Sequence, residues 1–318
     1  MAYTETIEQI AEMCLKNNPC RLEIRYNEPM TDHCTFKTGG PADCWMRPSG
    51  EGFPAFVIQL LAAAHSKGIP VFILGGGANI VIADRGIRGI VLDTGGWKGM
   101  AKSEEGKTCF YAGTSVDAAS EIAAEAGLSG MEFLAGMPGS IGGAVWMNAR
   151  CYGTEIADIL IETEVIDFSS GLPELKLFPA KREEFFYKHS PFQKRKTMIL
   201  SAAFQLMPGE KKEILAKMHF CRNDRQEKGH FRYPSAGSVF KNTPELGKAA
   251  GKIIDDLGLR GLSIGGAQVA PWHGNFIVNT GKATSADIRS LVCAVSEKVK
   301  AATGFILEPE IIFTGEWI

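Results

Sequence analysis

Two glycine clusters are the first segments of this sequence that could bind a charged ligand. Gly75-Gly76-Gly77 follows the apolar run Val71–Leu74, and a second glycine-rich loop spans Gly136–Gly143. Glycine tolerates positive φ angles and close backbone approach, so consecutive N–H groups in such loops can converge on a phosphate. Either cluster alone is typical of a tight structural turn. Together they favour a site that holds a pyrophosphate from two sides.

A short polar turn carries the groups best suited to proton transfer. The segment Pro234–Asn242 contains Ser235, Ser238, Lys241 and Asn242. A serine hydroxyl beside a glycine turn can donate a proton if its neighbours position it. The same composition also fits a serine-rich turn that is followed by an edge strand.

Charged side chains in two further segments are candidates for stabilising charge on a ligand. Glu308 and Glu310 lie within the apolar run Phe305–Phe313, which predicts a strand with both carboxylates on one face. Tyr187-Lys188-His189-Ser190 supplies a phenol and a cation. An exposed strand face and a solvated basic surface are the competing interpretations of these two segments.

Two common nucleotide-binding motifs are missing. Ile80 stands where a GxGxxG loop starting at Gly75 needs its third glycine, and the chain has no GxxxxGK[ST] segment. The six histidines do not fall at metal-ligand spacing with a cysteine pair. We therefore predict no bound metal, no Rossmann or P-loop site and no hydrolase triad.

Periodicity along the chain predicts helices and strands in alternation around these loops. We expect a charged helical connector over Lys211–Lys228. The other expected helices are Ala55–Lys67, Ser115–Ala126, Lys248–Leu257 and Ser285–Ala302, and the expected strands are Val71–Leu74, Cys109–Ala112 and Phe305–Phe313.

Length and composition limit the class of protein. With 318 residues, 45% hydrophobic and 22% charged residues and a net charge of -2, the chain is long enough for two or three domains and has no basic excess for nucleic acid. The longest apolar stretch, Ala55–Ala64, is interrupted by Gln59 and is too short to span a membrane. The N-terminus lacks a basic, then apolar leader, and eight scattered cysteines are typical of reduced thiols. We expect a cytoplasmic protein that acts on a small molecule, with no membrane, nucleic-acid or obligate protein partner.

Eight short segments, read in order along the chain, resemble one known enzyme family. They are TFKTGGPA at Thr35–Ala42, GGGAN at Gly75–Asn79, FLAGMPGSIGG at Phe133–Gly143, YKHS at Tyr187–Ser190, PSAGSVFKN at Pro234–Asn242, GGAQV at Gly265–Val269, NFIVN at Asn275–Asn279 and LEPE at Leu307–Glu310. This series resembles the UDP-N-acetylenolpyruvoylglucosamine reductases, and the short spacing from Ser238 to Gly265 resembles their type II branch. The resemblance runs from about Arg21 to Glu316.

The resemblance implies an α+β fold with a two-part FAD-binding unit of the PCMH/VAO type and a C-terminal α/β substrate-binding domain. The corresponding domains here would be residues 1–95, residues 96–207 together with 305–318, and residues 208–304. It implies non-covalent FAD, NADPH as hydride donor, and reduction of UDP-N-acetylglucosamine enolpyruvate to UDP-N-acetylmuramate for peptidoglycan synthesis.

The same resemblance implies a role for each matching residue. Ser238 would be the proton donor, Glu310 would assist at the substrate carboxylate, and Lys188 would bind the carboxylate or enolate. The residues expected to contact FAD are Gly75, Gly76, Gly77, Ala78, Asn79, Gly136, Pro138, Gly139, Ser140, Ile141, Gly142 and Gly143. The residues expected to hold the UDP-sugar are Tyr187, Arg225, Lys241, Asn242 and Gln268.

The sequence departs from the family pattern in four places. Lys188 stands where most members have arginine, so it keeps the charge but loses the planar fork. Ala78 replaces a serine, Arg150-Cys151 replaces Gly-Ala before Tyr152, and Pro271-Trp272 replaces more polar residues. Two alternatives therefore stay open: a related FAD oxidoreductase with another substrate, and a non-catalytic protein that binds FAD or a UDP-sugar.

Overall fold

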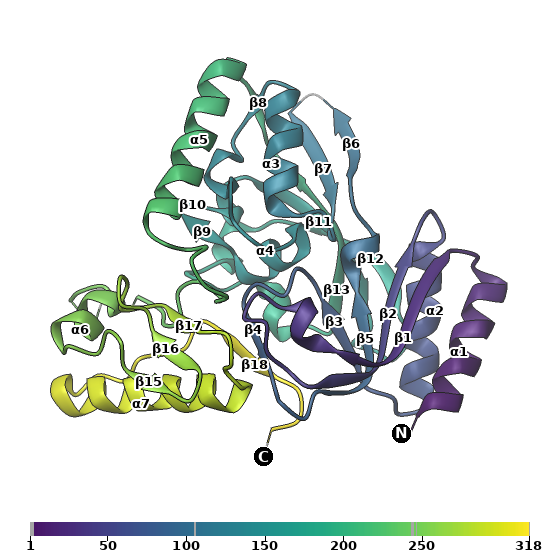
Figure 1. Ribbon diagram of the computed structural model, residues 1–318. Coiled ribbons are helices and arrows are strands. Elements are labelled where there is room, and N and C mark those ends of the chain that lie inside the picture. Colours follow the sequence, from purple (N-terminus) through teal and green to yellow (C-terminus); the bar gives the residue numbers. More distant parts are fainter. Residues whose placement is uncertain (1–2, 105, 243–244, 246, 318) are drawn as a thin grey trace. The chain divides into compact units, whose positions relative to one another are not determined.

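The computed structural model describes residues 3–104, 106–242, 245 and 247–317, which form two compact units (Figure 1). The first unit comprises Met1–Glu28, Asp43–Gly76 and Gly89–Asn223, and the second comprises Pro29–Ala42, Gly77–Arg88 and Asp224–Ile318. The chain therefore passes between the units several times.

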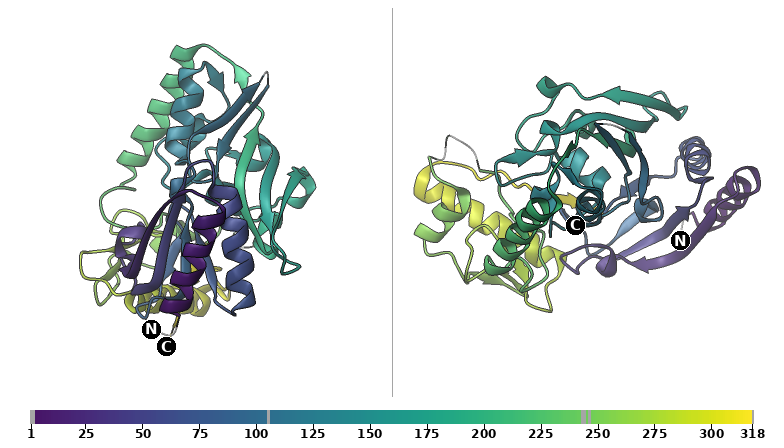
Figure 2. Two further views of the ribbon diagram at one scale, coloured as in Figure 1. Left: turned by 90° about the vertical axis from the view of Figure 1, so that its right-hand side faces the viewer. Right: turned by 90° about the horizontal axis from the view of Figure 1, so that it is seen from above.

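A four-stranded sheet with two helices forms one layer of the first unit. The strand order is β1 (Arg21–Pro29), β2 (Pro41–Ser49), β5 (Ile87–Asp93), β3 (Val71–Leu74), and β3 runs parallel to β5. Helices α1 (Thr4–Asn17) and α2 (Phe53–Ser66) lie side by side against it (Figure 2). Their buried apolar faces, with Phe56 and Leu60, share a core with the sheet. The predicted strand Val71–Leu74 and the predicted helix Ala55–Lys67 are thus confirmed.

A five-stranded antiparallel sheet forms the other layer of the first unit. Its order is β12 (Glu174–Pro179), β11 (Leu160–Asp167), β13 (Thr197–Phe204), β7 (Lys107–Tyr111), β6 (Met100–Glu104). Helices α3 (Val116–Glu125) and α4 (Ile141–Met147) supply apolar residues to its core, which includes Phe110 and Phe204. Two short antiparallel strand pairs also occur in this unit: β9 (Arg150–Cys151) with β10 (Thr154–Glu155), which form a hairpin, and β8 (Leu128–Ser129) with β14 (Met207–Pro208).

The charged connector predicted over Lys211–Lys228 is a helix, α5 (Lys211–Glu227). Buried Ile214 and Met218 pack it against the α3 region of the same unit (Figure 1). Arg222 adds ion pairs to Asp117 at 2.8 Å and Glu121 at 2.6 Å. One of the charged residues that suggested a connector, Arg222, therefore helps to attach α5 to α3.

The second unit combines a three-stranded sheet with two helices and a parallel strand pair. The sheet order is β15 (Ser263–Ile264), β16 (Ala267–Val269), β17 (Ile277–Asn279). Helices α6 (Ala250–Asp256) and α7 (Ser285–Thr303) confirm the two predicted C-terminal helices. Strand β4 (Ile80–Ile82) pairs in parallel with β18 (Ile312–Thr314). The end of the chain thus returns to a segment that precedes it by more than two hundred residues.

The predicted strand over Phe305–Phe313 is wrong in extent. Regular pairing is limited to Ile312–Thr314, and Pro309 makes only an isolated bridge with Phe240. Pro309 has no N–H for a continuous ladder, which explains why the apolar run does not form one long strand.

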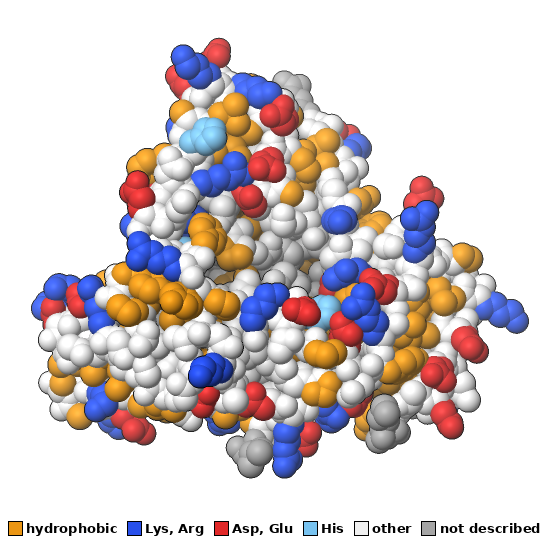
Figure 3. Space-filling view, in the orientation of Figure 1, with side chains coloured by type: hydrophobic (Ala, Val, Ile, Leu, Met, Phe, Trp, Pro, Cys, Tyr) orange, Lys and Arg blue, Asp and Glu red, His pale blue; other side chains and the backbone are white. Residues whose placement is uncertain are grey.

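No helix among the described residues is both long and apolar enough to cross a membrane. On the face of the molecule in Figure 3, lysine and arginine side chains are interspersed with aspartate and glutamate. That face has no continuous basic stripe of the kind that binds a nucleic-acid backbone.

We expect Asp84→Ala to weaken the start of α7. The two carboxylate oxygens of Asp84 accept hydrogen bonds from the amides of Ser285 and Ala286, both at 2.8 Å. Losing this cap should lower the unfolding free energy by about 1–2 kcal/mol. Thermal denaturation and amide exchange at the start of α7 would measure the loss. Glu297→Ala, on the exposed face of the same helix, is the control, and equal melting of the two variants would contradict the assignment.

Candidate active site

The two glycine loops meet within the first unit. Gly75 and Gly76 follow β3, and Ser140 caps the start of α4. The Gly76 amide donates a hydrogen bond to Ser140 Oγ at 3.3 Å, and the Gly143 amide donates to the same oxygen at 3.3 Å. A Cβ atom placed on Gly76 would lie 2.7 Å from Gly139 Cα. Only glycine allows the loops to approach this closely.

The meeting point of these loops has the form expected for a phosphate-binding cradle. Gly76, Pro138 and Gly143 are exposed although the backbones behind them are in contact. A ligand can therefore approach the main chain of both loops without displacing a side chain. These are residues at which the sequence led us to expect the pyrophosphate of FAD.

The remaining residues of the first loop belong to the second unit. Gly77 has φ of 62°, and a Cβ there would collide with the carbonyl oxygen of His33. Asn79 Nδ2 donates a hydrogen bond to the Glu310 carbonyl oxygen at 3.1 Å. The predicted cofactor residue Asn79 and the predicted catalytic residue Glu310 are thus neighbours.

Tyr187 and Lys188 form the centre of a tight turn in the first unit. Phe186 and His189 exchange backbone hydrogen bonds of 3.1 and 3.0 Å across it, and Lys188 has φ of 58°. Lysine occupies this left-handed conformation at a cost, so the surroundings must hold the turn in place.

Three polar side chains hold that turn. Asn148, which is fully buried, donates from Nδ2 to the Phe186 carbonyl oxygen at 3.0 Å. Gln193 Nε2 donates to the Lys188 carbonyl oxygen at 3.1 Å. Ser190, also fully buried, donates to the carbonyl oxygen of Trp146 in α4 at 2.6 Å. The backbone of this turn is therefore anchored by buried and half-buried polar side chains.

Two cations lie over the ring of Tyr187. The Lys188 Nζ atom is 6.0 Å from the ring centroid, and the Arg150 Cζ atom is 5.8 Å from it. Both distances are within the range of a cation–π contact. Two positively charged side chains, one from the turn and one from strand β9, therefore lie close to the Tyr187 ring.

In the second unit, the segment after Ser238 pairs with the segment that ends at Glu310. The Lys241 amide donates to the Glu308 carbonyl oxygen at 2.9 Å, and the Glu310 amide donates to the Val239 carbonyl oxygen at 2.7 Å. Lys241 Nζ also forms an ion pair with Glu308 Oε1 at 2.6 Å. This pairing brings two predicted catalytic residues, Ser238 and Glu310, to adjacent positions on two neighbouring strands of chain.

Asn275 fixes the same region through its side-chain amide. Its Oδ1 atom accepts from the Phe240 amide at 2.9 Å, and its Nδ2 atom donates to the Phe240 carbonyl oxygen at 2.8 Å. Nothing in the spacing of the sequence signals this role, nor those of Gln193 and Asn148, because side chains that hydrogen-bond to distant backbone have no periodic pattern.

The other predicted substrate residues have different environments. The Arg225 side chain is buried, with 6% of the residue exposed, whereas Asn242 is exposed. Asn242 Oδ1 accepts a hydrogen bond of 2.8 Å from the Ala250 amide at the start of α6. Gln268 Nε2 donates to Ser263 Oγ at 3.0 Å. Asn242 and Gln268 therefore already have structural contacts in addition to any ligand contact.

A half-buried histidine, His230, lies beside Arg225. Burial, and then the nearby Arg225 guanidinium, lower the pKa of His230 to about 4. Burial also lowers the pKa of His273, and both imidazoles contact the ring of Phe276, at 4.7 and 4.3 Å between centroids. Both imidazoles are therefore neutral near pH 7.

A segment with the GxSxG pattern, Gly261–Gly265, was not anticipated in the sequence and does not form a nucleophile elbow. Ser263 is exposed on the two-residue strand β15, and its hydroxyl donates to the Gly261 carbonyl oxygen at 3.0 Å. A nucleophile elbow needs a strand–turn–helix junction. Among the described residues, no group of three or more histidine, cysteine or acidic side chains could hold a metal ion.

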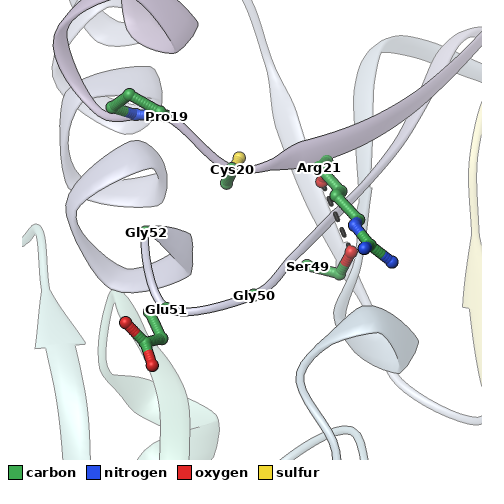
Figure 4. A pocket seen from close by; sticks show the side chains of 7 residues that line it. All are labelled: Pro19, Cys20, Arg21, Ser49, Gly50, Glu51 and Gly52. Atoms are coloured by element: carbon green, nitrogen blue, oxygen red, sulfur yellow. Dashed lines mark hydrogen bonds between the residues drawn. The ribbon is translucent and has the colours of Figure 1, made fainter.

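Two surface hollows are lined by none of the predicted site residues. One, of about 610 Å³, lies in the first unit between the end of α1 and the start of α2 (Figure 4). It is lined by Pro19, Cys20, Arg21, Ser49, Gly50, Glu51 and Gly52. The other, of about 490 Å³, lies in the second unit beside α7.

Gly76→Ala should destabilise the protein, because the new methyl group would meet the backbone at Gly139 rather than a movable side chain. Overpacking of this kind costs about 1–3 kcal/mol. Gly143→Ala is the matched control, since a Cβ there meets only Ser140 Oγ at 3.4 Å. Thermal denaturation of the apoproteins separates the two variants, and equal melting temperatures would refute the close approach of the loops.

Acidification should destabilise the protein through His230. Because its folded pKa lies below the ordinary value of 6.5, the unfolded chain binds the proton more readily. The stability contributed by neutral His230 is complete above about pH 6.5 and is lost as pH falls toward about 4, by at most about 1.4 kcal/mol per pH unit. His230→Gln should flatten this part of the unfolding profile, whereas His219→Gln, at an exposed position on α5, should not. Parallel profiles for wild type and His230→Gln would contradict this expectation.

Comparison with known proteins adds independent evidence. A model of an FAD binding domain matches residues 54–172, and a model of the C-terminal domain of UDP-N-acetylenolpyruvoylglucosamine reductase matches residues 229–314. Reductases of that name from Treponema denticola and Treponema pallidum are 40% and 37% identical to this chain. The alignments cover 95% and 92% of this chain, and 98% and 94% of those proteins.

The solved structure of the Thermus caldophilus enzyme gives the same result at the level of the fold. It superposes with a TM-score of 0.74 at 33% identity, covering 93% of this chain and 100% of that one. The predicted α+β fold, with an FAD-binding part followed by a separate C-terminal domain, is confirmed. The chain belongs to the UDP-N-acetylenolpyruvoylglucosamine reductase family.

Proposed function

We propose that this protein reduces UDP-N-acetylglucosamine enolpyruvate to UDP-N-acetylmuramate with NADPH, through bound FAD, in peptidoglycan precursor synthesis. Family membership over nearly the whole chain supports the reaction. The observation that supports assigning this reaction to particular residues is the backbone pairing between the Ser238 and Glu310 segments. That pairing places the Ser238 segment and the Glu310 segment side by side, and the family motif has a serine and a glutamate at these two positions.

FAD would be held by the glycine loops Gly75–Asn79 and Gly136–Gly143. Their close approach and exposed outer faces suit a pyrophosphate, and Ala78 still offers its backbone although it lacks a hydroxyl. When bound, FAD supplies hydride-carrying redox chemistry that no side chain of the protein offers.

Ser238 is assigned to proton transfer. Reduction of the enol ether adds a hydride to the terminal carbon and a proton to the neighbouring carbon that bears the carboxylate. Ser238 Oγ is the donor of that proton, and Gly237, at φ of 72°, shapes the turn that presents it. A half-buried position limits the competing access of water to this hydroxyl.

Glu310 and Lys188 are assigned to charge that develops on the substrate. Lys188 offers a cation to the substrate carboxylate, while Glu310 assists at the same end of the enolpyruvyl group. The backbone of Glu310 is held on both sides, by Asn79 at its carbonyl oxygen and by Val239 at its amide. A group restrained in this way needs little reorganisation during the reaction.

Tyr187, Arg225, Lys241, Asn242 and Gln268 are proposed to hold the UDP-sugar. Arg225 is the strongest candidate for a phosphate, because its guanidinium offers planar donors that match phosphate oxygens. Lys241 already pairs with Glu308, so a phosphate must compete with that carboxylate for its ammonium group.

The division into domains 1–95, 96–207 with 305–318, and 208–304 remains part of this proposal. A cytoplasmic location is also proposed, because NADPH and nucleotide sugars are cytoplasmic metabolites. The structure has no disulfide among its eight cysteines, as expected for a reducing compartment. Measuring the redox state of these cysteines in the cell tests the cytoplasmic location.

Anaerobic spectroscopy of the purified protein tests the reaction. NADPH should bleach the oxidised flavin band, and UDP-N-acetylglucosamine enolpyruvate should restore it with formation of the lactyl product. Recovery with oxygen alone would leave the FAD-binding part intact and refute the substrate. A protein that takes up no FAD would refute the whole proposal.

Ser238→Ala should slow the second half of this cycle selectively. Reduction by NADPH should be unchanged, while reoxidation by the substrate should fall by about 10²- to 10⁴-fold because the proton donor is lost. Stopped-flow absorbance measures the two halves separately. Ser290→Ala, on the exposed surface of α7, should match wild type in both halves. Unchanged reoxidation in Ser238→Ala would assign the proton to another group.

A further inference from the structure

We infer that Arg150 is a ligand-binding residue, whose guanidinium takes an oxyanion group of the ligand beside Lys188. The inference rests on the proposed function. Two departures from the family pattern, Arg150 and Lys188, come together on one side chain, since both cations lie about 6 Å from the ring centroid of Tyr187. Positive charge gathered in this way attracts a carboxylate or a phosphate.

The hairpin that carries Arg150 is fixed in place. Cys151 pairs with Thr154, and the two residues between them, Tyr152 and Gly153, have φ angles of 51° and 84°. Positive φ at both positions gives the turn that suits a two-residue hairpin. Tyr152 also donates from its hydroxyl to the carbonyl oxygen of Cys221 at 3.1 Å, which attaches the turn to α5. The base of the Arg150 side chain is therefore well defined.

No carboxylate among the described residues neutralises Arg150. The residue opposite it in the hairpin ladder is Glu155, the nearest candidate by register. Glu155 is already engaged, because its side chain is 8% exposed and binds Arg182 at 2.7 Å. Arg150 itself is exposed and makes no ion pair in the part of the chain that the structure describes. Its donors are therefore available to a ligand.

An arginine at this position restores what Lys188 lacks. A guanidinium offers planar donors that match both oxygens of a carboxylate or phosphate, whereas the ammonium group of lysine is a point charge. Contact with the Tyr187 ring orders the Arg150 side chain without occupying the N–H groups at its edge.

Equilibrium binding separates the possible sources of the oxyanion. Three probes are titrated into holoenzyme by calorimetry: the enolpyruvyl substrate, UDP-N-acetylglucosamine, which lacks the carboxylate, and NADP⁺. We expect Arg150→Gln to weaken at least one of these by about 10- to 100-fold. Weaker binding of the enolpyruvyl substrate alone identifies the carboxylate, and weaker binding of both UDP-sugars identifies their phosphates. Weaker binding of NADP⁺ alone identifies the phosphates of the dinucleotide.

The double variant Arg150→Gln/Lys188→Arg provides the rescue test. If Arg150 supplies a guanidinium, moving that group to position 188 should recover most of the lost affinity, whereas a structural role for Arg150 would not be rescued there. Arg195→Gln is the matched control, because Arg195 lies over the Phe178 ring at 4.8 Å in the same unit. Melting temperature and flavin content verify that each variant is folded.

The outcomes for the two proposals are distinct. Unchanged affinity of Arg150→Gln for all three probes overturns the role of Arg150, whether or not the wild type turns over. Loss of affinity without rescue, or an equal loss in Arg195→Gln, also overturns it. The proposed function fails separately, if the wild type is reduced by NADPH but is not reoxidised by the enolpyruvyl substrate.

Discussion

The arrangement of the predicted site in the first unit depends on the contact between backbones at Gly76 and Gly139. Side chains are excluded from that contact, because even one methyl group would meet main-chain atoms. The end of β3 and the start of α4 are therefore locked together, and Ser140 joins them by accepting hydrogen bonds from Gly76 and Gly143. Placement of α4 in turn sets the position of Trp146, whose carbonyl oxygen holds Ser190 and Gln193. The predicted cofactor cradle and the Tyr187–Lys188 turn thus depend on one close approach.

The second unit achieves comparable order by other means. Its strands are short, and the segment around Ser238 has only isolated bridges to Phe276 and Pro309. Amide side chains form hydrogen bonds with backbone groups that are not paired between strands. Asn275 satisfies both backbone groups of Phe240, and Asn279 Nδ2 donates to the Phe36 carbonyl oxygen at 2.9 Å. Irregular backbone near a reactive hydroxyl can be rigid when buried polar side chains satisfy it in this way.

Local pattern was sufficient to predict the elements that have a strong period. Val71–Leu74 and the helices at Ala55, Ser115 and Ser285 followed from apolar spacing and caps, which depend on neighbouring residues only. The pairing of the last strand, β18, with β4 could not be predicted, because the two strands are more than two hundred residues apart in the sequence. The start of β18 was also missed, because the apolar run continues on both sides of Pro309. Motif order was sufficient to predict the family. Gln193, Asn148 and Asn275 could not be predicted, since their hydrogen bonds join segments that are separated in sequence.

Cations in this molecule differ according to what neutralises them. Arg222 and Arg182 pair with carboxylates within 2.8 Å, so their charge serves mainly to hold segments together. Arg150 instead lies over an aromatic ring, an interaction worth only about 0.5–1 kcal/mol at an exposed site. A ligand that must bind and leave in each cycle cannot displace a well-made ion pair without cost, but it can add to a cation–π contact. Arg47 lies over the Trp45 ring but also pairs with Asp93 at 3.0 Å, so a ring contact alone does not mark a charge that is available for binding. Arg150 combines its ring contact with the lack of an ion pair among the described residues, and this combination suits it to an anionic ligand.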